Sequence, residues 1–145
     1  MTLILFTVIS VFSLLNASNL ERETGDLKIE IPEIKNQKGL IYIVVYNSEE
    51  GFPNDAEKAV YKKRIEEYSN SIIHTFEDIP YGKYAIVIMQ DKNGNGKMDR
   101  KKFPPRPKEP IGISNMNKLG KPNYSNALVD FNENGMVVSI KLMNQ

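Results

Sequence analysis

The residues best suited to chemistry form one oxygen-rich loop, residues 91–99. Side-chain oxygens recur at its first, third, fifth and ninth positions, and a glycine that permits a sharp turn stands at the sixth. Calcium takes about six to eight oxygen ligands, and alternate residues of a tight loop can direct their oxygens to one centre. The seventh residue would contribute only its backbone carbonyl. The spacing predicts a calcium site whose loop ligands are Asp91, Asn93, Asn95, Lys97 and Asp99.

Another ligand has to close this predicted site, because the twelfth position, an acid in an EF-hand, is Lys102. Glu109, Asp78 and Asp130 are the candidates, and we favour Glu109, with water filling what remains. Nearby basic residues predict weak affinity, ~10⁻⁴ to 10⁻³ M, as in extracellular calcium modules. The alternative is a plain loop without metal, since Asn-Gly pairs are ordinary turn formers.

A hydrolase is the rival class of function. His74 is the only histidine, and it lies between Ile72 and Phe76 in an apolar alternation that indicates a half-buried structural role. A catalytic triad needs an exposed serine within hydrogen-bond reach of the imidazole, and no nucleophile motif surrounds Ser114 or Ser125. We therefore expect a protein that is not an enzyme.

Two groups of residues are candidates for binding a ligand. A basic cluster could contact anionic polysaccharide or lipid headgroups, although a solvated charged loop is the alternative. Tyr81 and Tyr124 lie in expected loops, whereas strand spacing assigns Tyr42, Tyr46 and Tyr84 to the core or its border. The basic cluster consists of Arg100, Lys101, Lys102, Arg106 and Lys108.

The elements that must position these residues are strands. Short runs rich in β-branched and aromatic residues alternate with turn signals, which is typical of a β-sandwich or barrel. We expect the third and fourth runs to pair through a Pro-x-Gly turn, and the last two through an Asn-Gly turn. The runs are residues 27–31, 40–46, 71–76, 83–89, 127–131 and 136–142.

Residues 55–68 are the only segment with a helical pattern. Asp55 is a suitable N-cap, but the apolar stripe behind it is thin, so we expect a short helix or a turn. Residues 63–68 fit equally an edge strand protected by its charges.

Composition predicts one globular domain, residues 19–145, after an export signal. With 41% hydrophobic and 26% charged residues the chain suits a single core, and a net charge of +1 provides no field that would gather nucleic acid. The absence of cysteine excludes disulfides, thiolate metal sites and lipoprotein acylation. Stability must therefore come from packing, with or without a metal.

Residues 1–18 predict a secretory signal. They carry no charge, and an apolar run from Leu3 to Leu15 is followed by the small and polar Asn16, Ala17 and Ser18. The run is shorter than the roughly 20 residues that span a bilayer but suits a signal peptide. We expect cleavage near Ala17 or Ser18, a secreted, periplasmic or cell-envelope location, and no transmembrane span afterwards. No Lys or Arg precedes the run, so a retained N-terminal anchor is the alternative.

Three segments, residues 76–85, 91–99 and 107–115, resemble the DUF2141 family, and the likeness extends over about residues 27–142. The resemblance implies an exported bacterial protein of unknown function. It also implies an all-β fold, an immunoglobulin-like or prealbumin-like two-sheet antiparallel β-sandwich. The chain has Pro105-Arg106 where the family commonly has a glycine, but Glu109, Gly112, Ser114 and Asn115 match. A folded loop packed against residues 91–99 is therefore expected.

These observations predict a non-enzymatic exported module, calcium-stabilised, whose long loops bind an envelope or extracellular ligand such as a carbohydrate, a peptide or a protein. A metal-free structural or accessory domain is the alternative.

Overall fold

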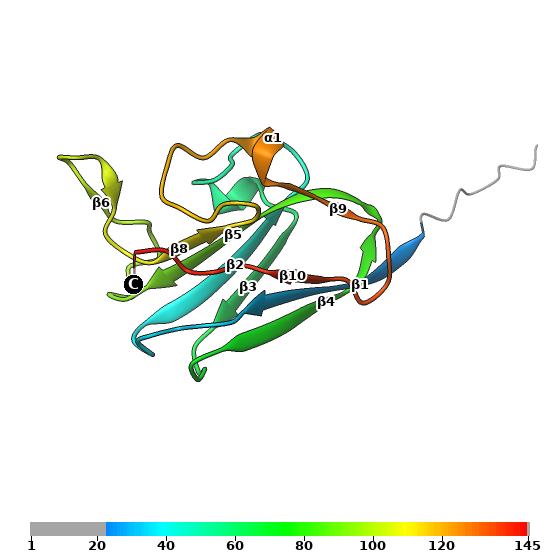
Figure 1. Cartoon of the computed structure of the whole chain (residues 1–145), viewed down its shortest axis with the longest axis horizontal. Helices are drawn as coiled ribbons and strands as arrows, with labels where there is room; N and C mark the ends of the chain where they lie inside the picture. Colours follow the sequence, from blue (N-terminus) through cyan, green and yellow to red (C-terminus); the bar gives the residue numbers. More distant parts are fainter. Residues whose placement is uncertain (1–22, 145) are drawn as a thin grey trace, which may run out of the picture.

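The computed structural model describes residues 23–144, so the predicted signal segment lies outside the described residues. Almost all regular structure is strand, which confirms the all-β prediction (Figure 1). The strands are β1 (Thr24–Ile31), β2 (Leu40–Tyr46), β3 (Tyr61–Ile65), β4 (Ile72–Pro80), β5 (Gly82–Asp91), β6 (Arg100–Lys101), β7 (Arg106–Pro107), β8 (Ile111–Ile113), β9 (Leu128–Phe131) and β10 (Val137–Ser139), with a 3₁₀ turn η1 (Ala56–Lys58) and a short helix α1 (Tyr124–Ala127).

Two sheets make up the body of the domain. One has the order β10-β1-β4, and the other has the order β3-β2-β5-β8, with β9 also pairing with β5. Pairing is antiparallel except between β1 and β10, which run parallel. The two short strands β6 and β7 form a separate hairpin. The architecture is consistent with a β-sandwich, and the immunoglobulin-like strand order stays a prediction.

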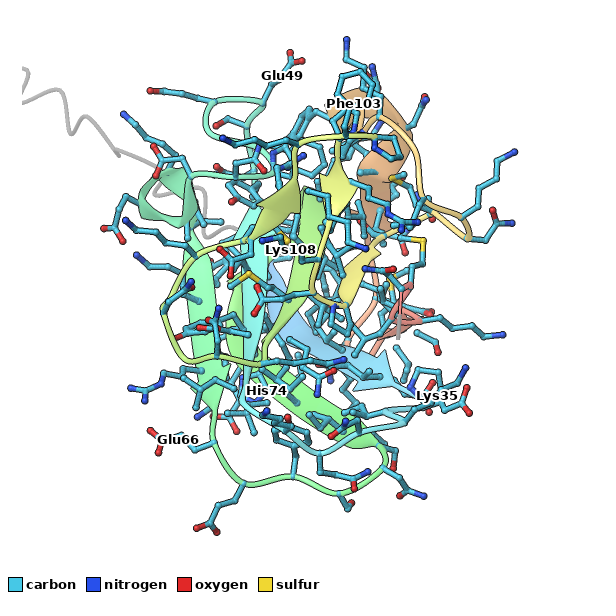
Figure 2. All side chains as sticks on the ribbon, turned by 90° about the vertical axis from the view of Figure 1, so that its left-hand side faces the viewer. Lys35, Glu49, Glu66, His74, Phe103 and Lys108 are labelled. Carbon is cyan, nitrogen blue, oxygen red and sulfur yellow. The ribbon has the colours of Figure 1, made fainter. Side chains whose placement is uncertain are left out.

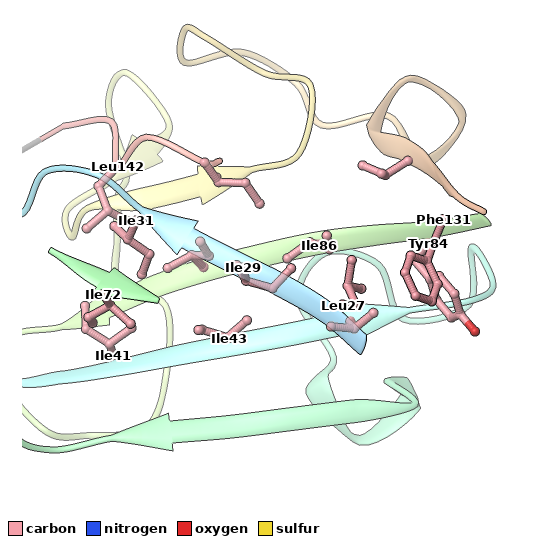
Figure 3. Close-up of a cluster of buried hydrophobic side chains, with 14 of the residues drawn as sticks. Leu27, Ile29, Ile31, Ile41, Ile43, Ile72, Tyr84, Ile86, Phe131 and Leu142 are labelled. Carbon is pink, nitrogen blue, oxygen red and sulfur yellow. The ribbon is translucent and has the colours of Figure 1, made fainter. Parts of the chain in front are cut away.

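The main core lies between the two sheets. Along β1 every second residue is buried, so Leu27, Ile29 and Ile31 face the other sheet. Ile43 of β2 and Ile86 of β5 meet them from the opposite side (Figure 3). Removing this apolar surface from water is the main stabilising contribution to the fold.

The five-stranded sheet is also covered on its second face, which we call the outer face. Residues of β2 and β5 that alternate with the core residues, among them Val44, Tyr46 and Val87, are buried in a separate apolar cluster with Ile113. The segments carrying α1 and the β6–β7 hairpin lie over this face (Figure 1). The continuous apolar sequence of residues 40–46 reflects this burial on both faces.

Two expected hairpins are wrong. β4 pairs with β1 rather than with β5, and β10 pairs with β1 rather than with β9. The Pro-x-Gly and Asn-Gly turns therefore carry the chain from one sheet to the other. Turn residues determine only where the chain reverses direction. Which strands then pair depends on which of their faces must be buried.

Residues 55–68 combine both alternatives considered for them. Asp55 caps η1, its carboxylate accepting a hydrogen bond from the Glu57 N–H at 3.0 Å, but the helix is a single 3₁₀ turn. Strand β3 then forms the edge of the five-stranded sheet, with exposed Lys62, Lys63 and Arg64 along it. Charges of this kind discourage pairing with another chain.

Candidate functional site

Asp91 ends strand β5 and organises the 91–99 loop from inside. Its residue is 0% exposed, and its carboxylate accepts hydrogen bonds from the backbone N–H groups of Gly94 at 2.8 Å, Asn95 at 3.2 Å and Gly96 at 2.7 Å. Each backbone donor that points at this carboxylate offsets part of the cost of burying its charge. The loop is therefore wound around one buried acid.

Asp99 gathers the outer side chains of the same loop. Its Oδ2 accepts hydrogen bonds from Nδ2 of Asn93 at 2.6 Å and from Nδ2 of Asn95 at 3.2 Å. The Oδ1 atoms of the two asparagines accept from the backbone N–H groups of Asn95 and Lys97 at 3.1 Å and 2.8 Å. Four of the predicted ligand side chains thus lie within one hydrogen-bonded loop.

Glu109, the acid favoured as the closing ligand, lies against the 91–99 loop, and its role as a metal ligand stays a prediction. It is 4% exposed, and its carboxylate accepts hydrogen bonds from the N–H groups of Lys92 at 2.9 Å and Asp99 at 3.3 Å. The β6–β7 hairpin returns the chain to this point, since the Lys108 N–H also donates to the Asp99 carbonyl at 2.8 Å. Residues far apart in the loop are thereby fixed to each other.

The two other acids considered as closing ligands are elsewhere. Asp130 pairs with Lys83 at the start of β5, eight residues before Asp91, which places it about 26 Å along the strand. Asp78 belongs to β4, close to the turn that leads into β5. Neither can reach the 91–99 loop.

The structure does not test calcium binding, but it shows which donor groups surround the 91–99 loop. Within residues 23–144, no group of three or more His, Cys, Asp or Glu side chains is arranged to hold a metal. The oxygen donors around the loop are the buried carboxylates of Asp91 and Glu109, the half-exposed carboxylate of Asp99, and the side-chain amides of Asn93 and Asn95. Hard oxygen donors of this kind fit calcium, whereas none of them favours a soft transition metal.

Of the residues considered for hydrolysis, Ser114 and His74 pack within the fold, whereas Ser125 is exposed on α1. Ser114 is fully buried; its Oγ accepts a hydrogen bond from the Ile86 N–H at 2.9 Å and donates to the Ala127 carbonyl. His74 packs edge-on against Phe76, with ring centroids 4.6 Å apart. Burial, helped by the charge of Lys63, lowers the pKa of this imidazole. Within the described chain His74 forms no hydrogen bond to either serine considered.

A cavity of about 640 Å³ lies on the outer face of the five-stranded sheet, next to the 91–99 loop. Its floor includes Tyr42, Val44 and Val87, and residues 96–98 of the loop form part of its wall. A second cavity, of about 440 Å³, lies under the β6–β7 hairpin and shares Arg100 with the first. Cavities of about 300–1,000 Å³ are typical of small-molecule sites.

Sequence reasoning missed most of this cavity. Tyr46 is buried and Tyr42 packs against the same apolar cluster, as expected of the core and its border, but both also line the cavity. Tyr81, expected in a loop, packs on Phe131 with centroids 5.0 Å apart. Tyr124 stacks edge-on against Phe52. The sequence did contain one signal for this cavity: residues 40–46 are apolar on both faces. A strand of this kind needs loops to cover its second face, and the cavity lies under such loops.

Some residues of the predicted basic cluster line the cavities, and others are exposed to solvent. Arg100 lines both cavities and donates from Nη2 to Asn54 Oδ1 at 2.7 Å, so that it links two loops. Arg106 lines the second cavity, whereas Lys101 is exposed. Phe103, in the same hairpin, is 96% exposed (Figure 2).

Comparison with known proteins identifies the family of this chain but assigns it no activity. The model of the DUF2141 family, described as an uncharacterized protein conserved in bacteria, matches residues 29–139. No curated protein and no solved structure matches the chain. Among the described residues, no helix has the length and apolar character needed to cross a membrane.

Proposed function

Because the chain belongs to the DUF2141 family of uncharacterized bacterial proteins, which has no assigned activity, we propose a function from its sequence and geometry. The chain is an exported, non-enzymatic β-sandwich module that binds an envelope or extracellular ligand through its loop-covered face, and calcium stabilises its 91–99 loop. The observation that carries this proposal is the pair of buried carboxylates, Asp91 and Glu109, which both accept hydrogen bonds from backbone N–H groups of the 91–99 loop.

Their surroundings favour a cation. Among the described residues, neither Asp91 nor Glu109 forms an ion pair, so neither buried carboxylate has a basic side chain as partner. Buried charges are normally paired or bound to metal, because backbone donors offset only part of the lost hydration. A calcium ion would supply the missing positive charge.

The residues that would hold calcium are those predicted from the sequence. Asp91, Asn93, Asn95 and Asp99 would provide side-chain oxygens, Lys97 its carbonyl, and Glu109 the closing carboxylate. The amide nitrogens of both asparagines now point at Asp99. In the calcium-bound loop each amide would present its oxygen instead, which a rotation of the amide allows.

The non-enzymatic part of the proposal is supported by the roles of the alternative residues. Ser114 uses its hydroxyl to tie β5 to the segment before β9, and His74 packs on an aromatic ring. A nucleophile needs a free hydroxyl beside a base, and the buried, hydrogen-bonded Ser114 does not provide one.

Export is supported by residues 1–18, whose apolar run and small polar end fit a cleaved signal. The mature protein would then lie in the periplasm, in the cell envelope or outside the cell. The intact mass of the protein recovered from the cell exterior or periplasm tests this, since cleavage near Ala17 or Ser18 removes a defined mass. A full-length protein retained in membranes would contradict it and favour an anchor.

Thermal melting of the purified protein with calcium, with magnesium and with chelator tests the metal site. A ligand that binds only the folded state stabilises it by RT ln(1 + [L]/Kd), which is about 1 to 2 kcal/mol at about 5 mM calcium and Kd ~10⁻⁴ to 10⁻³ M. We expect the melting temperature to rise by a few degrees with calcium and not with magnesium.

Two matched variants locate the effect. Asp99→Asn removes a half-exposed carboxylate of the loop and is expected to abolish the calcium response. Asp130→Asn removes an exposed carboxylate at the far end of β5 and is expected to keep it. Equal calcium responses in both variants would place the ion outside this loop.

A metal-free structural or accessory module is the second candidate. The observation in its favour is that backbone N–H groups already donate three hydrogen bonds to Asp91 and two to Glu109. These bonds close the loop without an ion. Melting curves that coincide in calcium and chelator would favour this candidate.

A further inference from the structure

The outer-face cavity has an apolar floor made of buried and half-buried side chains. Val44, Val87 and Met89 of β2 and β5 provide the floor, and Met98 of the 91–99 loop lies on the wall. The β-sandwich core is already filled on the other side of the same strands. The floor therefore lies in a space of about 640 Å³ that no side chain of the described chain fills.

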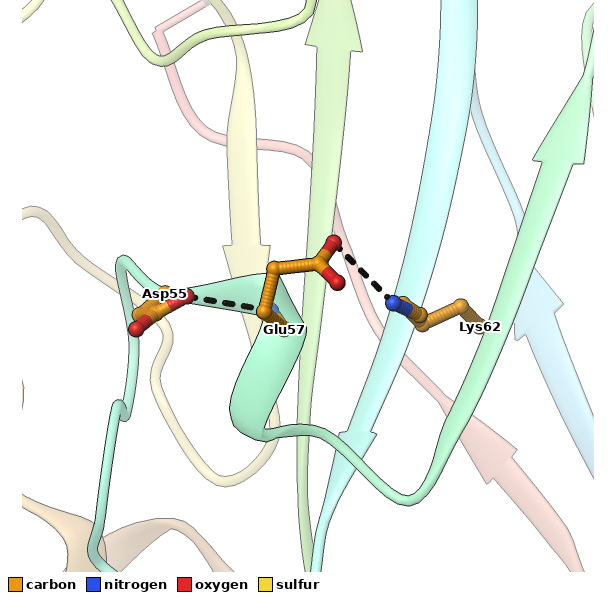
Figure 4. A network of polar contacts seen from close by, with 3 residues as sticks. All are labelled: Asp55, Glu57 and Lys62. Atoms are coloured by element: carbon orange, nitrogen blue, oxygen red, sulfur yellow. Dashed lines mark hydrogen bonds and ion pairs between the residues drawn. The ribbon is translucent and has the colours of Figure 1, made fainter.

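The rim of this cavity is strongly cationic. Five basic residues line it, against one acid, Glu57, and one of the five, Arg64, is paired with Glu66 outside the lining at 3.1 Å. Glu57 is already paired with Lys62 at 3.2 Å on the exposed edge of the sheet (Figure 4). Lys97 and Arg100 form no ion pair within residues 23–144, and Arg100 donates a hydrogen bond to Asn54, which also lines the cavity.

Tyr46 adds a hydroxyl at one end of the floor. The residue is 1% exposed and lines the cavity. Burial, followed by the nearby Asp55 carboxylate, raises the pKa of Tyr46 to about 12. The hydroxyl therefore stays protonated at neutral pH and can donate a hydrogen bond.

We propose that this cavity binds a small organic anion with an apolar body and a single anionic head group. The body lies on the floor formed by Val44 and Val87, and the head group lies between Lys97 and Arg100. This proposal gives a ligand class to the binding module proposed above and rests on its ligand-binding part, not on its calcium site. A neutral sugar would leave both cations without a partner.

Two fluorescent probes that share one ring system test the proposal. Anilinonaphthalene sulfonate carries an anionic group, and N-phenylnaphthylamine has the same rings without it. Each is titrated into the folded protein in the presence of chelator, so that the result does not depend on calcium. We expect saturable binding of the sulfonate that is about tenfold tighter than that of the neutral probe, as one well-placed charged contact provides.

Paired variants separate this site from general surface charge. Lys97→Gln with Arg100→Gln removes the two head-group contacts and is expected to weaken sulfonate binding about tenfold, leaving the neutral probe unchanged. Lys101→Gln with Lys102→Gln removes the same charge from exposed residues that do not line the cavity, and is expected to have no effect. Melting curves of both variants confirm that they are folded.

The methionines report where the probe binds. Met89 and Met98 line the proposed cavity, whereas Met116 and Met143 line the second one. We expect the sulfonate to shift the methyl NMR signals of the first pair. Equal affinity for the two probes, equal losses in the two double variants, or shifts confined to Met116 and Met143 would each overturn the proposal. Calcium melting is independent of all three outcomes, so the two proposals fail separately.

Discussion

At the scale of single residues, Asp91 shows how a buried acid can shape a loop. Its carboxylate collects three backbone N–H groups within residues 94–96, which requires the chain to turn back on itself twice. Gly94 and Gly96 have φ values of +72° and +71°, a conformation that costs most side chains energy. The alternating Asn-Gly sequence is therefore needed for the turns whether or not calcium binds.

His74 gives a prediction at the same scale. Because burial and Lys63 lower its pKa below the usual 6.5, the folded protein binds fewer protons here than the unfolded chain does. The stability present above pH 6.5 should fall as pH drops through 6.5 towards the folded-state pKa. We expect His74→Gln to lose this part of the pH dependence.

Melting temperatures at about pH 7.5 and about pH 5.5 check this, since no other side chain is expected to titrate mainly in that window. His74 is the only histidine of the chain, which isolates its contribution. An equally large fall in both proteins would show that carboxylates, not His74, cause the pH dependence.

At the scale of elements, the C-terminal segment is held against β8 by close backbone packing. Ile111 and Met143 form a bridge with hydrogen bonds of 3.1 Å and 2.8 Å. Between them, a Cβ on Gly112 would lie 2.8 Å from Cγ2 of Ile140 and 3.0 Å from the Lys141 carbonyl oxygen. Gly112 therefore sets the distance between β8 and the end of the chain.

Gly112→Ala should destabilise the protein by about 1–3 kcal/mol, because the added methyl must displace this segment or strain the core. Gly120→Ala is the matched control, since a Cβ there would meet nothing within 4 Å. Both substitutions restrict the unfolded chain equally, so their difference measures the packing effect. Equal unfolding free energies in urea would contradict the close approach described.

At the scale of the whole molecule, the fold depends on the chain changing sheets. β4 and β5 are consecutive in the sequence, yet β4 belongs to the three-stranded sheet and β5 to the five-stranded sheet. The same is true of β9 and β10. The two sheets are thus joined by chain crossings as well as by their shared core, which favours unfolding as one unit.

Ile29→Ala tests how much the shared core contributes. Ile29 is fully buried between the sheets, and its truncation should cost about 2–5 kcal/mol. Ile73, on the adjacent strand β4, is 67% exposed, and Ile73→Ala should change stability by less than about 1 kcal/mol. Urea unfolding of both variants checks the difference; similar losses would show that β4 faces the core differently.

The sequence by itself determined the local features of the protein. Alternating and continuous apolar runs predicted the strands, because side chains point to opposite faces at every step. Residues 40–46 were bounded as the structure has them. Asp55 was predicted as a cap, and Asp91 with its Asn-Gly pairs as a specialised loop, since capping and turn preferences act over a few residues.

Only the tertiary structure decided which strands pair and what the loops enclose. The Pro-x-Gly and Asn-Gly turns predicted two hairpins that do not form. β4 pairs with β1 instead, and β5 pairs with β2, whose two faces are both buried. Glu109 was one of three acids that the sequence offered as a closing ligand, and the β6–β7 hairpin brings Glu109 to the 91–99 loop. The outer-face cavity combines residues from β2, β3, β5 and two loops, and no local pattern records such a distant assembly.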